Sequence, residues 1–495
     1  MSRSPYEKNQ ILTVTITDLG SEGEGIGKVD GFPFFVKGAV PGDVAEIKVT
    51  KTAARMAYAR VECLLGSSPN RIDPLCEVAG PCGGCNLQHY SYEGQLAFKQ
   101  NKVKNNLMRI GGIEKEYLEK IMEPIIGMND PGEEPWHYRN KAQVPFGKNR
   151  EGKTICGFYA GRTHSIIPQT TCALGVPENE AVLDAVLKYM EECGAAPYDE
   201  ESGKGLIRHV LIRKSRAYGQ LMVCLVINGK KLPGQEHLIE RLRGVPGMYS
   251  VSISVNREKT NVIMGSSYET IWGEATIEDR ICLCEETKET ARDGTETTLW
   301  KETENGGVIY RISPLSFYQV NPVQTQKLYS TALRYADLKG EETVWDLYCG
   351  IGTISLFLAG KAGKVYGVEI VPQAIEDAWA NARRNGIENA EFFTGAAEVV
   401  LPAFYEKHRN DTSVHPDVIV VDPPRKGCDK ACLDTMILMQ PERIVYVSCD
   451  SATLARDVKY LEVRGYHLIK VRACDMFPQT THVETVCLMS RVEGK

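Results

Sequence analysis

The stretch Glu342–Glu369, ETVWDLYCGIGTISLFLAGKAGKVYGVE, decides the fold of the C-terminal third of this chain. Its pattern predicts a strand ending at Asp346, a glycine turn, a helix, and a second strand ending on Glu369. Three more strand-like runs follow, NAEFFTG, DVIVVDPPRKG and RIVYVSCD, each continued by polar or helical sequence. This alternation predicts a doubly wound α/β sheet, in which ligands bind at the carboxyl ends of the strands.

Two chemically active residues follow predicted strands of this sheet. Cys449 comes directly after Ile444–Ser448, where a free cysteine would otherwise be read as a small buried hydrophobe. Asp422 begins the sequence DPPR. A nicotinamide-binding Rossmann domain is one alternative, because an acidic residue about 20 positions after the glycines can bind ribose. The glycines only approximate that fingerprint, and DLYCGIGT resembles the turn of a Rossmann-type methyltransferase instead.

The DPPR sequence indicates which atom of a base would be methylated. Asp/Asn-Pro-Pro-Tyr is typical of enzymes that methylate exocyclic amino groups of bases, whose nitrogen needs no catalytic thiol. Here Arg425 replaces the aromatic residue and Cys449 follows the next strand. A thiol beside a methyl donor suits carbon 5 of a pyrimidine, which becomes reactive only after a nucleophile adds to carbon 6.

Length and composition limit the number of domains and the kinds of partner that this chain can have. A chain of 495 residues suggests about three domains. With 58 basic and 64 acidic residues the net charge is −6, so any contact with nucleic acid must come from local basic faces. The first ten residues lack an apolar signal-peptide core, and no run approaches the ~18 apolar residues of a spanning helix. We therefore expect a soluble, cytoplasmic protein without a membrane partner.

The first sixty or so residues alternate apolar and polar positions between glycine-rich turns, which predicts a small antiparallel barrel. GSEGEGIGKVDG leads into another strand rather than a helix, which argues against a phosphate loop. The stretch with GAVPGDVAEIKV resembles a TRAM domain, an OB-like barrel appended to RNA-modifying enzymes.

Three cysteines, Cys76, Cys82 and Cys85, lie within ten loop residues at C-x5-C-x2-C spacing. This spacing favours an iron–sulfur cluster over zinc, since zinc ribbons usually pair two CxxC motifs. Either group needs a fourth ligand, for which Cys172 is the first candidate and Cys156 the second.

Two local clusters of basic residues are candidate phosphate contacts. One lies on a predicted helix, with Lys99, Lys102, Lys104 and Arg109, and the other in IRHVLIRKSRA, with Arg208, Arg213, Lys214 and Arg216. Residues 136–272 alternate strand-like runs, among them KAQVPFG, GQLMVCLVIN and TNVIMG, with helical ones, which predicts a mixed α/β domain. The polar segment Glu278–Glu304 predicts a hairpin or linker insertion.

In this order the motifs closely resemble the RNA (uracil-5-)-methyltransferases, in particular bacterial 23S rRNA members that carry a TRAM domain and a 4Fe-4S cluster. The motifs are GAVPGD, the three spaced cysteines with a distant fourth, SFYQVNP, DLYCGIG, GVE, DPPRKG, SCDSATLARD and MFPQTTHVET. The resemblance implies an α/β multidomain chain: a TRAM OB-like barrel over 5–63, a central RNA-binding and iron–sulfur domain over 64–92 and 124–308, and a Rossmann-type methyltransferase domain over 93–123 and 309–495. The segment Glu278–Glu304, with Cys282 and Cys284, departs from the family pattern.

The resemblance also implies the roles of individual residues. Cys449 would be the nucleophile and Glu484 the base, with His482 as the rival base. The cluster ligands would be Cys76, Cys82, Cys85 and Cys172, and the residues lining the S-adenosylmethionine and base pocket would be Gln319, Tyr348, Glu369 and Asp422. Asp422 would bond to the imino group of a flipped-out uracil. Arg456 is one cation that would lower the pKa of the Cys449 thiol.

The implied reaction is methylation of carbon 5 of a uridine in RNA, with 23S rRNA as the expected substrate and the protein acting as a monomer. Three alternatives stay open: a transfer-RNA uracil-5 methyltransferase, an exocyclic-amine base methyltransferase, and an RNA-binding module whose methyltransferase domain is inactive.

Overall fold

The computed structural model describes residues 4–161, 163–290, 296–303, 307–411 and 414–492. The chain forms two compact units. The first unit comprises Met1–Lys102, Phe158–Ile167 and Phe477–His482, and the second comprises Val103–Gly157, Pro168–Met476 and Val483–Lys495. Each is described by itself below.

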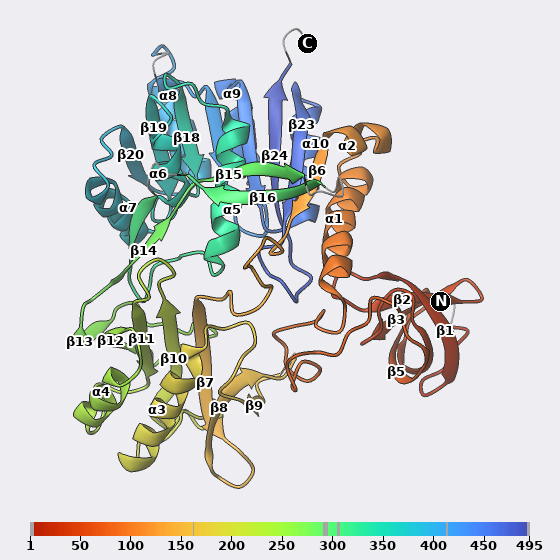
Figure 1. Ribbon diagram of the computed structural model, residues 1–495. Helices are drawn as coiled ribbons and strands as arrows, with labels where there is room; N and C mark the ends of the chain where they lie inside the picture. Colours follow the sequence, from red (N-terminus) through yellow and green to blue (C-terminus); the bar gives the residue numbers. More distant parts are fainter. Residues whose placement is uncertain (1–3, 162, 291–295, 304–306, 412–413, 493–495) are drawn as a thin grey trace. The chain divides into compact units, whose positions relative to one another are not determined.

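The first unit contains a closed five-stranded barrel with strand order β1-β2-β3-β5-β4 (Figure 1). The strands are β1 (Ile11–Leu19), β2 (Gly25–Val29), β3 (Phe32–Lys37), β4 (Val44–Thr52) and β5 (Ala57–Gly66). A side chain at Gly27 would meet Thr15 O at 2.5 Å, so only glycine allows this approach of β2 to β1. The predicted barrel is confirmed, but it is not fully antiparallel, because β3 pairs with β5 in parallel. An odd number of strands cannot close a ring with antiparallel pairs alone.

The second unit contains the predicted doubly wound sheet, eight strands in the order β20-β19-β18-β21-β22-β24-β23-β6. These are β6 (Met122–Ile126), β18 (Thr343–Leu347), β19 (Lys364–Glu369), β20 (Ala390–Thr394), β21 (Val418–Val421), β22 (Arg443–Ser448), β23 (Tyr466–Cys474) and β24 (Glu484–Arg491). Strands β18 to β22 run parallel, and β24 is antiparallel to β22. The strand order reverses between β18 and β21, which is the topological switch point where such sheets bind ligands.

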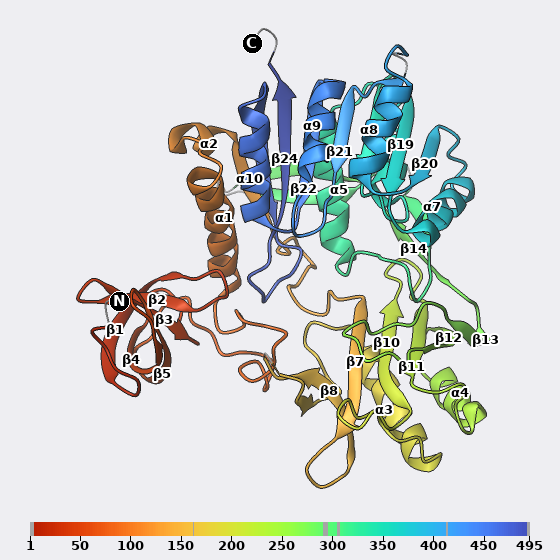
Figure 2. The same ribbon diagram turned by 180° about the vertical axis from the view of Figure 1, so that it is seen from behind.

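Helices cover both faces of this sheet. Figure 1 shows α5 (Pro322–Ala336) on one face, where α6 (Thr353–Ala359) and α7 (Pro372–Arg384) also pack. Figure 2 shows α8 (Ala397–Lys407), α9 (Lys430–Met439) and α10 (Ser451–Glu462) on the other. Two further helices precede β6: α1 (Tyr92–Arg109) and α2 (Lys115–Ile121). With both faces buried, the parallel strands are almost wholly apolar, as in Val418–Val421.

A seven-stranded sheet also belongs largely to the second unit, with the order β13-β12-β11-β10-β7-β8-β9. Its strands are β7 (Lys141–Lys148), β8 (Thr154–Tyr159), β9 (Ile166–Pro168), β10 (Ile207–Lys214), β11 (Leu221–Ile227), β12 (Met248–Val255) and β13 (Glu269–Gly273), and it carries α3 (Glu178–Glu192) and α4 (Gln235–Arg243). The mixed α/β prediction is confirmed, but TNVIMG is not a strand. The Asn256 amide donates to Val262 O and Ile263 O instead.

The described residues of the segment Glu278–Glu304 form strands, which agrees with the predicted hairpin and not with a linker. Strand β14 (Ile277–Ile281) pairs with β17 (Val308–Ile312), and β15 (Cys284–Thr290) forms a hairpin with β16 (Glu296–Glu302). Arg472 of β23 anchors this hairpin by two bonds to Glu286, at 2.7 and 2.8 Å, and its guanidinium lies over the Trp300 ring. The insertion is therefore fastened to the methyltransferase sheet.

Cys282 and Cys284 belong to this anchorage. Their backbone N–H groups donate to Gln326 and Ser330 of α5. Burial, followed by the charge of Glu302, raises the pKa of Cys284 to about 12. A thiol held protonated in this way packs rather than reacts.

No described helix combines the length and the apolar composition that crossing a bilayer requires.

Candidate active site

The predicted site residues meet at the carboxyl ends of four parallel strands. Tyr348 follows β18, Glu369 ends β19, Asp422 follows β21, and Cys449 follows β22. Because these strands are neighbours in the sheet, their ends share one edge, at the switch point. The glycine turn and the acidic strand end also lie where the sequence predicted them.

Glu484 reaches this edge from the opposite direction. It is the first residue of antiparallel β24, and its neighbour Thr485 pairs with Ser448 of β22. This register brings Glu484 to the end of β22, where Cys449 begins the next turn. Glu484 is 5% exposed, so its carboxyl is buried at this edge of the sheet. His482, the rival base, is an exposed residue of the first unit.

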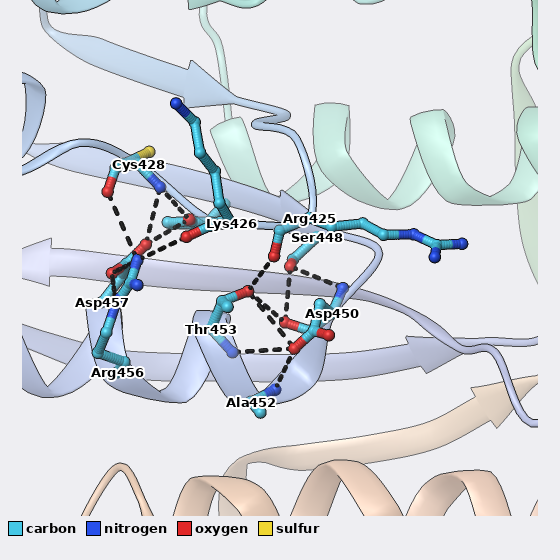
Figure 3. A network of polar contacts seen from close by, with 10 residues as sticks. Arg425, Lys426, Cys428, Ser448, Asp450, Ala452, Thr453, Arg456 and Asp457 are labelled. Carbon is cyan, nitrogen blue, oxygen red and sulfur yellow. Dashed lines mark hydrogen bonds and ion pairs between the residues drawn. The ribbon is translucent and has the colours of Figure 1, made fainter. Parts of the chain in front are cut away.

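The turn that carries Cys449 is held by the start of α10 (Figure 3). Asp450 caps the helix, its Oδ1 accepting from Ala452 N at 2.9 Å and Thr453 N at 3.0 Å. The Ser448 hydroxyl accepts from Asp450 N and donates to Asp450 O. Cys449 therefore lies between two residues that are bonded to each other, which fixes its backbone.

The same helix holds the loop that follows Asp422. Thr453 Oγ1 donates to Arg425 O at 3.1 Å, and Arg456 Nη2 donates to Lys426 O at 3.0 Å (Figure 3). Asp457 accepts from Cys428 N at 3.0 Å and pairs with Arg456 at 2.7 Å. Two loops far apart in sequence are thus joined, while the Arg425 side chain points away from these bonds.

Electrostatics show that Cys449 lies among charged groups. Burial, and then the charges of Glu484 and Asp422, raise the pKa of its thiol to about 11, and the charge of Arg425 opposes them. Burial raises the pKa of Glu484 to about 8, with the same contributions from Asp422 and Arg425. Burial also raises the pKa of Asp422 to about 7. One thiol, two carboxyls and one guanidinium therefore form a single electrostatic cluster.

The sequence predicted that Arg456 or another local cation lowers the pKa of the Cys449 thiol. The cation that does so is Arg425 of the DPPR sequence, whereas Arg456 pairs with Asp457 and donates to backbone carbonyls. A position just before a helix N-terminus favours a thiolate. Here burial and the two carboxyls outweigh that effect.

Glu369 is held in place by the glycine turn. Its Oε2 accepts from Gly350 N at 3.2 Å, and its Oε1 accepts from Val371 N at 2.9 Å. Each carboxylate oxygen keeps a free lone pair, which suits ribose hydroxyls. Gly350 has φ +56°, and a side chain there would meet nothing within 4 Å, so the turn is open above it.

Beneath the same turn lies a buried carboxyl that lacks one partner. Asp346 accepts from the Ser355 hydroxyl through Oδ2, while Oδ1 is buried without a hydrogen bond among the described residues. Burial raises the pKa of Asp346 to about 7, opposed by the bond from Ser355 and reinforced by the charges of Asp422 and Glu369. The open turn, the anchored Glu369 and this unpaired acceptor fit a cofactor that carries ribose and amino groups, as S-adenosylmethionine does.

Tyr348 and Gln319 contribute differently to this edge. Tyr348 has φ +69°, a strained conformation for a residue other than glycine, and its side chain packs toward Cys428 and Cys432. Gln319 lies on the loop before α5, where its carbonyl accepts from Asn140 at 3.0 Å. The side chain of Gln319 lies within hydrogen-bonding reach of the Tyr329 hydroxyl.

Tyr329 is a residue that sequence reasoning missed. It is buried on α5, its hydroxyl bonds with that of Thr353 at 3.4 Å, and its pKa is raised by burial and then by the charge of Asp422. The only sequence signal was its place in the helix after SFYQVNP. Arg425 was visible in DPPR as a replacement for an aromatic residue, but not as the cation facing Cys449.

The predicted cluster cysteines fall in both units. Cys76, Cys82 and Cys85 lie half-buried in the first unit, between β5 and α1, where Cys82 Sγ accepts from Gly84 N at 3.4 Å. Cys172 and its rival Cys156 belong to the second unit, and Cys156 is buried in β8. Across the described ranges, no three Cys, His, Asp or Glu side chains are arranged to hold a metal. The thiols suit a cluster chemically, and the cluster stays a prediction.

Most cations of the two basic clusters are bonded within the protein, whereas Arg109 and Arg216 are exposed. In the first unit, Lys99 is buried and donates to Phe477 O, and Lys102 donates to Thr481 O. In the second, Arg208 donates to Asn256 O and Glu258 O, and Lys214 pairs with Glu178 at 2.5 Å. Arg213 is 3% exposed. These cations hold the fold together, which their sequence spacing could not indicate.

A doubly wound sheet with an open glycine turn and an acidic second strand defines an S-adenosylmethionine-dependent methyltransferase of the Rossmann type. A family model described as tRNA (Uracil-5-)-methyltransferase matches residues 293–492, and a TRAM domain model matches residues 5–61. An uncharacterised RNA methyltransferase of Halalkalibacterium halodurans is 46% identical over 488 residues, 98% of each chain. One of Clostridium tetani is 44% identical over 487 residues, 98% of this chain and 97% of the relative. The chain belongs to the family of S-adenosylmethionine-dependent RNA (uracil-5-)-methyltransferases.

A solved structure agrees over nearly the whole chain. The Pyrococcus abyssi tRNA (uracil-54, C5)-methyltransferase, in complex with S-adenosyl-L-homocysteine, superimposes with a TM-score of 0.72 at 26% identity. The match covers 97% of this chain and 100% of that chain. The TRAM barrel and the methyltransferase fold predicted from the sequence are thus confirmed.

Proposed function

We propose that this protein methylates carbon 5 of a uridine in RNA through a covalent adduct between Cys449 and carbon 6. The observation that carries the proposal is the placement of Cys449 and Glu484 at the facing ends of β22 and β24, with Asp422 and Arg425 as electrostatic neighbours. A nucleophile and a base on neighbouring strands suit a reaction that needs addition at one carbon and proton removal at the next.

The protein residues act in a fixed order. The Cys449 thiol gives its proton to water and its sulfur bonds to carbon 6, which moves the carbon 5–carbon 6 π electrons onto the carbon 4 carbonyl as an enolate. Carbon 5 would then bond to the methyl group as the bond between that methyl and the sulfonium sulfur breaks, with its electron pair staying on that sulfur. The Glu484 carboxylate takes the proton from carbon 5, the carbon 5–carbon 6 double bond re-forms, and the sulfur leaves. Asp422 accepts from the imino N–H of uracil, which cytosine lacks.

S-adenosylmethionine, when bound, supplies an electrophilic methyl group. In our proposal Glu369 accepts from its ribose hydroxyls, and Gln319, Tyr348 and Asp422 line the rest of the pocket. Support comes from the open turn at Gly350 and from the anchored carboxylate of Glu369.

Incubation with tritiated cofactor and unmodified RNA, followed by nucleoside analysis, tests the reaction. We expect labelled 5-methyluridine, and no product with Cys449→Ala. Labelled exocyclic amines, together with full activity of Cys449→Ala, would favour the amine-methylating alternative. Binding of the cofactor with no labelled nucleoside from any RNA would favour an inactive RNA-binding module.

For the RNA itself, we propose 23S rRNA as the substrate. The family resemblance of the motifs supports this choice, whereas the structural match to a transfer-RNA enzyme favours transfer RNA as the second candidate. That match covers nearly all of this chain, so an N-terminal barrel does not separate the two substrates. Methylation of ribosomal and transfer RNA from a strain lacking the gene, assayed side by side, decides between them.

We further propose that Cys76, Cys82, Cys85 and Cys172 hold a 4Fe-4S cluster with a structural role. Three thiols within one short loop support the proposal, and neither addition nor methyl transfer moves an electron. Protein purified without oxygen should be brown and contain about four irons per chain, and Cys76→Ser should bleach it. A colourless protein with one zinc per chain would overturn the assignment.

Finally, we propose that the enzyme acts as a cytoplasmic monomer. Its sixteen cysteines are dispersed rather than organised as a disulfide framework, which suits a reducing compartment. Mass measurement in solution should give about 55 kDa, the mass of one chain. A value twice as large would refute the monomer.

A further inference from the structure

The segment Glu278–Glu304 has no part in the proposed reaction, yet one of its carboxylates bonds to the loop 313–321 at the active-site edge. That carboxylate belongs to Asp279 of β14, which is fully buried. Its Oδ2 accepts from the Tyr318 hydroxyl at 3.2 Å. Tyr318 directly precedes Gln319 on the loop, which joins β17 to α5. The segment therefore contacts the part of the loop that carries Gln319.

The Asp279 carboxylate is fixed from its other side. Its Oδ1 accepts from Ser215 Oγ at 3.0 Å and from Ala217 N at 2.9 Å, in the turn that follows β10. The backbone of Asp279 lies opposite Tyr310 in the pair of β14 and β17. A carboxylate held in this way cannot follow Tyr318 if the tyrosine moves. Displacement of the loop would therefore break a buried hydrogen bond and leave an unpaired acceptor, which costs free energy.

The Tyr318 hydroxyl contributes a fixed position rather than packing. Burial, and then the charge of Asp279, raises the pKa of Tyr318 above its usual range, so the phenol keeps its proton and donates a hydrogen bond to the carboxylate. Its ring centroid lies 6.2 Å from that of Tyr310, a contact that a phenylalanine would keep. The bond to Asp279 is therefore what distinguishes tyrosine from phenylalanine at this position.

Packing alone does not fix this stretch of the loop. Phe317, on the other side of Tyr318, is 69% exposed. The carbonyl of Gln319 accepts from Asn140 at 3.0 Å, and its side chain lies within hydrogen-bonding reach of the Tyr329 hydroxyl. The bond from Asn140 holds the backbone of Gln319 at its carbonyl, and the bond from Tyr318 to Asp279 holds the residue just before it.

We propose that Asp279 and Tyr318 are positioning residues that hold Gln319 in the S-adenosylmethionine pocket. The inference rests on the proposed function, which places Gln319 in that pocket, and it gives the segment Glu278–Glu304 a role in cofactor binding. Neither residue touches the reacting atoms, because both act through Gln319.

Tyr318→Phe tests the proposal, because it removes the hydroxyl and keeps the ring. Calorimetry with S-adenosylhomocysteine measures the affinity of the pocket without RNA and without turnover. We expect Tyr318→Phe to bind about fivefold more weakly, the effect of about one weakened hydrogen bond. In methylation assays the KM for S-adenosylmethionine should rise with kcat unchanged. A merely destabilised protein would instead show a lower kcat at an unchanged KM, because fewer molecules are folded.

Two further variants show whether Tyr318 acts through Gln319. Gln319→Ala should lose at least as much affinity as Tyr318→Phe. The double variant should lose no more than Gln319→Ala alone, since a residue that only positions Gln319 then has nothing to position. The matched control is Tyr466→Phe, which removes another buried hydroxyl, one that donates to Pro441 O at 2.9 Å near the amino end of β22. This control should leave the affinity unchanged.

Unchanged S-adenosylhomocysteine affinity of Tyr318→Phe or of Gln319→Ala would overturn the inference. An equal loss in Tyr466→Phe would do the same, as would a double variant whose two losses multiply. If Tyr318→Phe does not fold, Asp279→Asn, which replaces one carboxylate oxygen by a donor, is measured in the same way with and without Gln319→Ala. Failure of the proposed function is a separate result. Wild-type protein that binds S-adenosylhomocysteine but produces no 5-methyluridine refutes the reaction, while the affinities still decide the role of Tyr318.

Discussion

Replacing Glu484 with glutamine should separate the two halves of the proposed reaction. Glutamine keeps the shape of the side chain but cannot take the proton from carbon 5. Glu484→Gln should therefore add Cys449 to the ring and accept the methyl group, and then stall because elimination is blocked. The expected product is a covalent protein–RNA adduct that carries the new methyl group.

The pKa values of Cys449 and Glu484 set the size of the expected change in adduct formation and turnover. With a thiol pKa of about 11, the thiolate of Cys449 at pH 7.5 is about 0.03% of the free protein. The Glu484 charge is the largest cause after burial that raises this pKa, so its removal lowers the pKa and adduct formation should begin at lower pH than in the wild type. Loss of a general base costs about 10²–10⁴-fold, so turnover to free product should fall at least about 100-fold.

Product formation by the wild-type enzyme should increase, rather than decrease, as the pH rises. The pKa of Glu484 is about 8, so the carboxylate that can accept the proton becomes the major form only above that pH. Product formation should rise with pH through 8 as Glu484 ionises, whereas adduct formation by Glu484→Gln should follow only the ionisation of the Cys449 thiol. A flat wild-type profile between pH 7 and 9 would contradict the assignment of the base.

The assay is a denaturing gel with tritiated cofactor across a pH series. Cys449→Ala should give no shifted band, which shows that the adduct depends on the thiol. His482→Gln controls for the rival base and should turn over normally. If His482→Gln accumulates the labelled adduct while Glu484→Gln turns over, the reasoning is refuted.

Three further predictions concern the active-site edge of the eight-stranded sheet and the anchored hairpin of β15 and β16. Cys449→Ala should lose methylation at least about 1000-fold but keep cofactor affinity by calorimetry; residual turnover near the wild-type level would exclude a thiol adduct. Glu369→Gln should weaken cofactor binding about tenfold, with RNA affinity as the unchanged control. Arg472→Met leaves Glu286 unpaired and should lower the free energy of unfolding by about 2 kcal/mol in denaturant titration; a change below about 0.5 kcal/mol would mean that the hairpin is not held by this arginine.

The parallel strands were predictable because they are buried on both faces. Runs such as Val418–Val421 and Ile444–Ser448 are apolar without alternation, and each ends in a polar turn that places Asp422 or Cys449 at the ligand-binding edge. The parallel pairing of β3 with β5 was not predictable, because alternation in sequence shows which face a residue occupies and not the direction of its neighbour.

The partners of charged residues could not be predicted from spacing. Lys99 and Arg213 stand in basic runs that look solvated, yet both are buried and donate to backbone carbonyls distant in sequence. Arg456 lies on the helix that begins just after Cys449, but the cation that opposes the carboxyls is Arg425, on the loop after β21 that is fastened to α10. Such choices depend on tertiary contacts that no local pattern encodes.

The raised pKa values also bear on when the thiol becomes reactive. In the free protein, burial and two nearby carboxyls keep Cys449 protonated, against the opposing charge of Arg425 and a backbone hydrogen bond. Glu484 is itself largely protonated below pH 8, which limits its repulsion of the thiolate at neutral pH. Addition to carbon 6 creates negative charge on the pyrimidine rather than on sulfur, so the adduct avoids the buried thiolate that the site disfavours. The same burial that makes the thiol a poor free nucleophile therefore favours its use only when a ring that can take up the charge is bound.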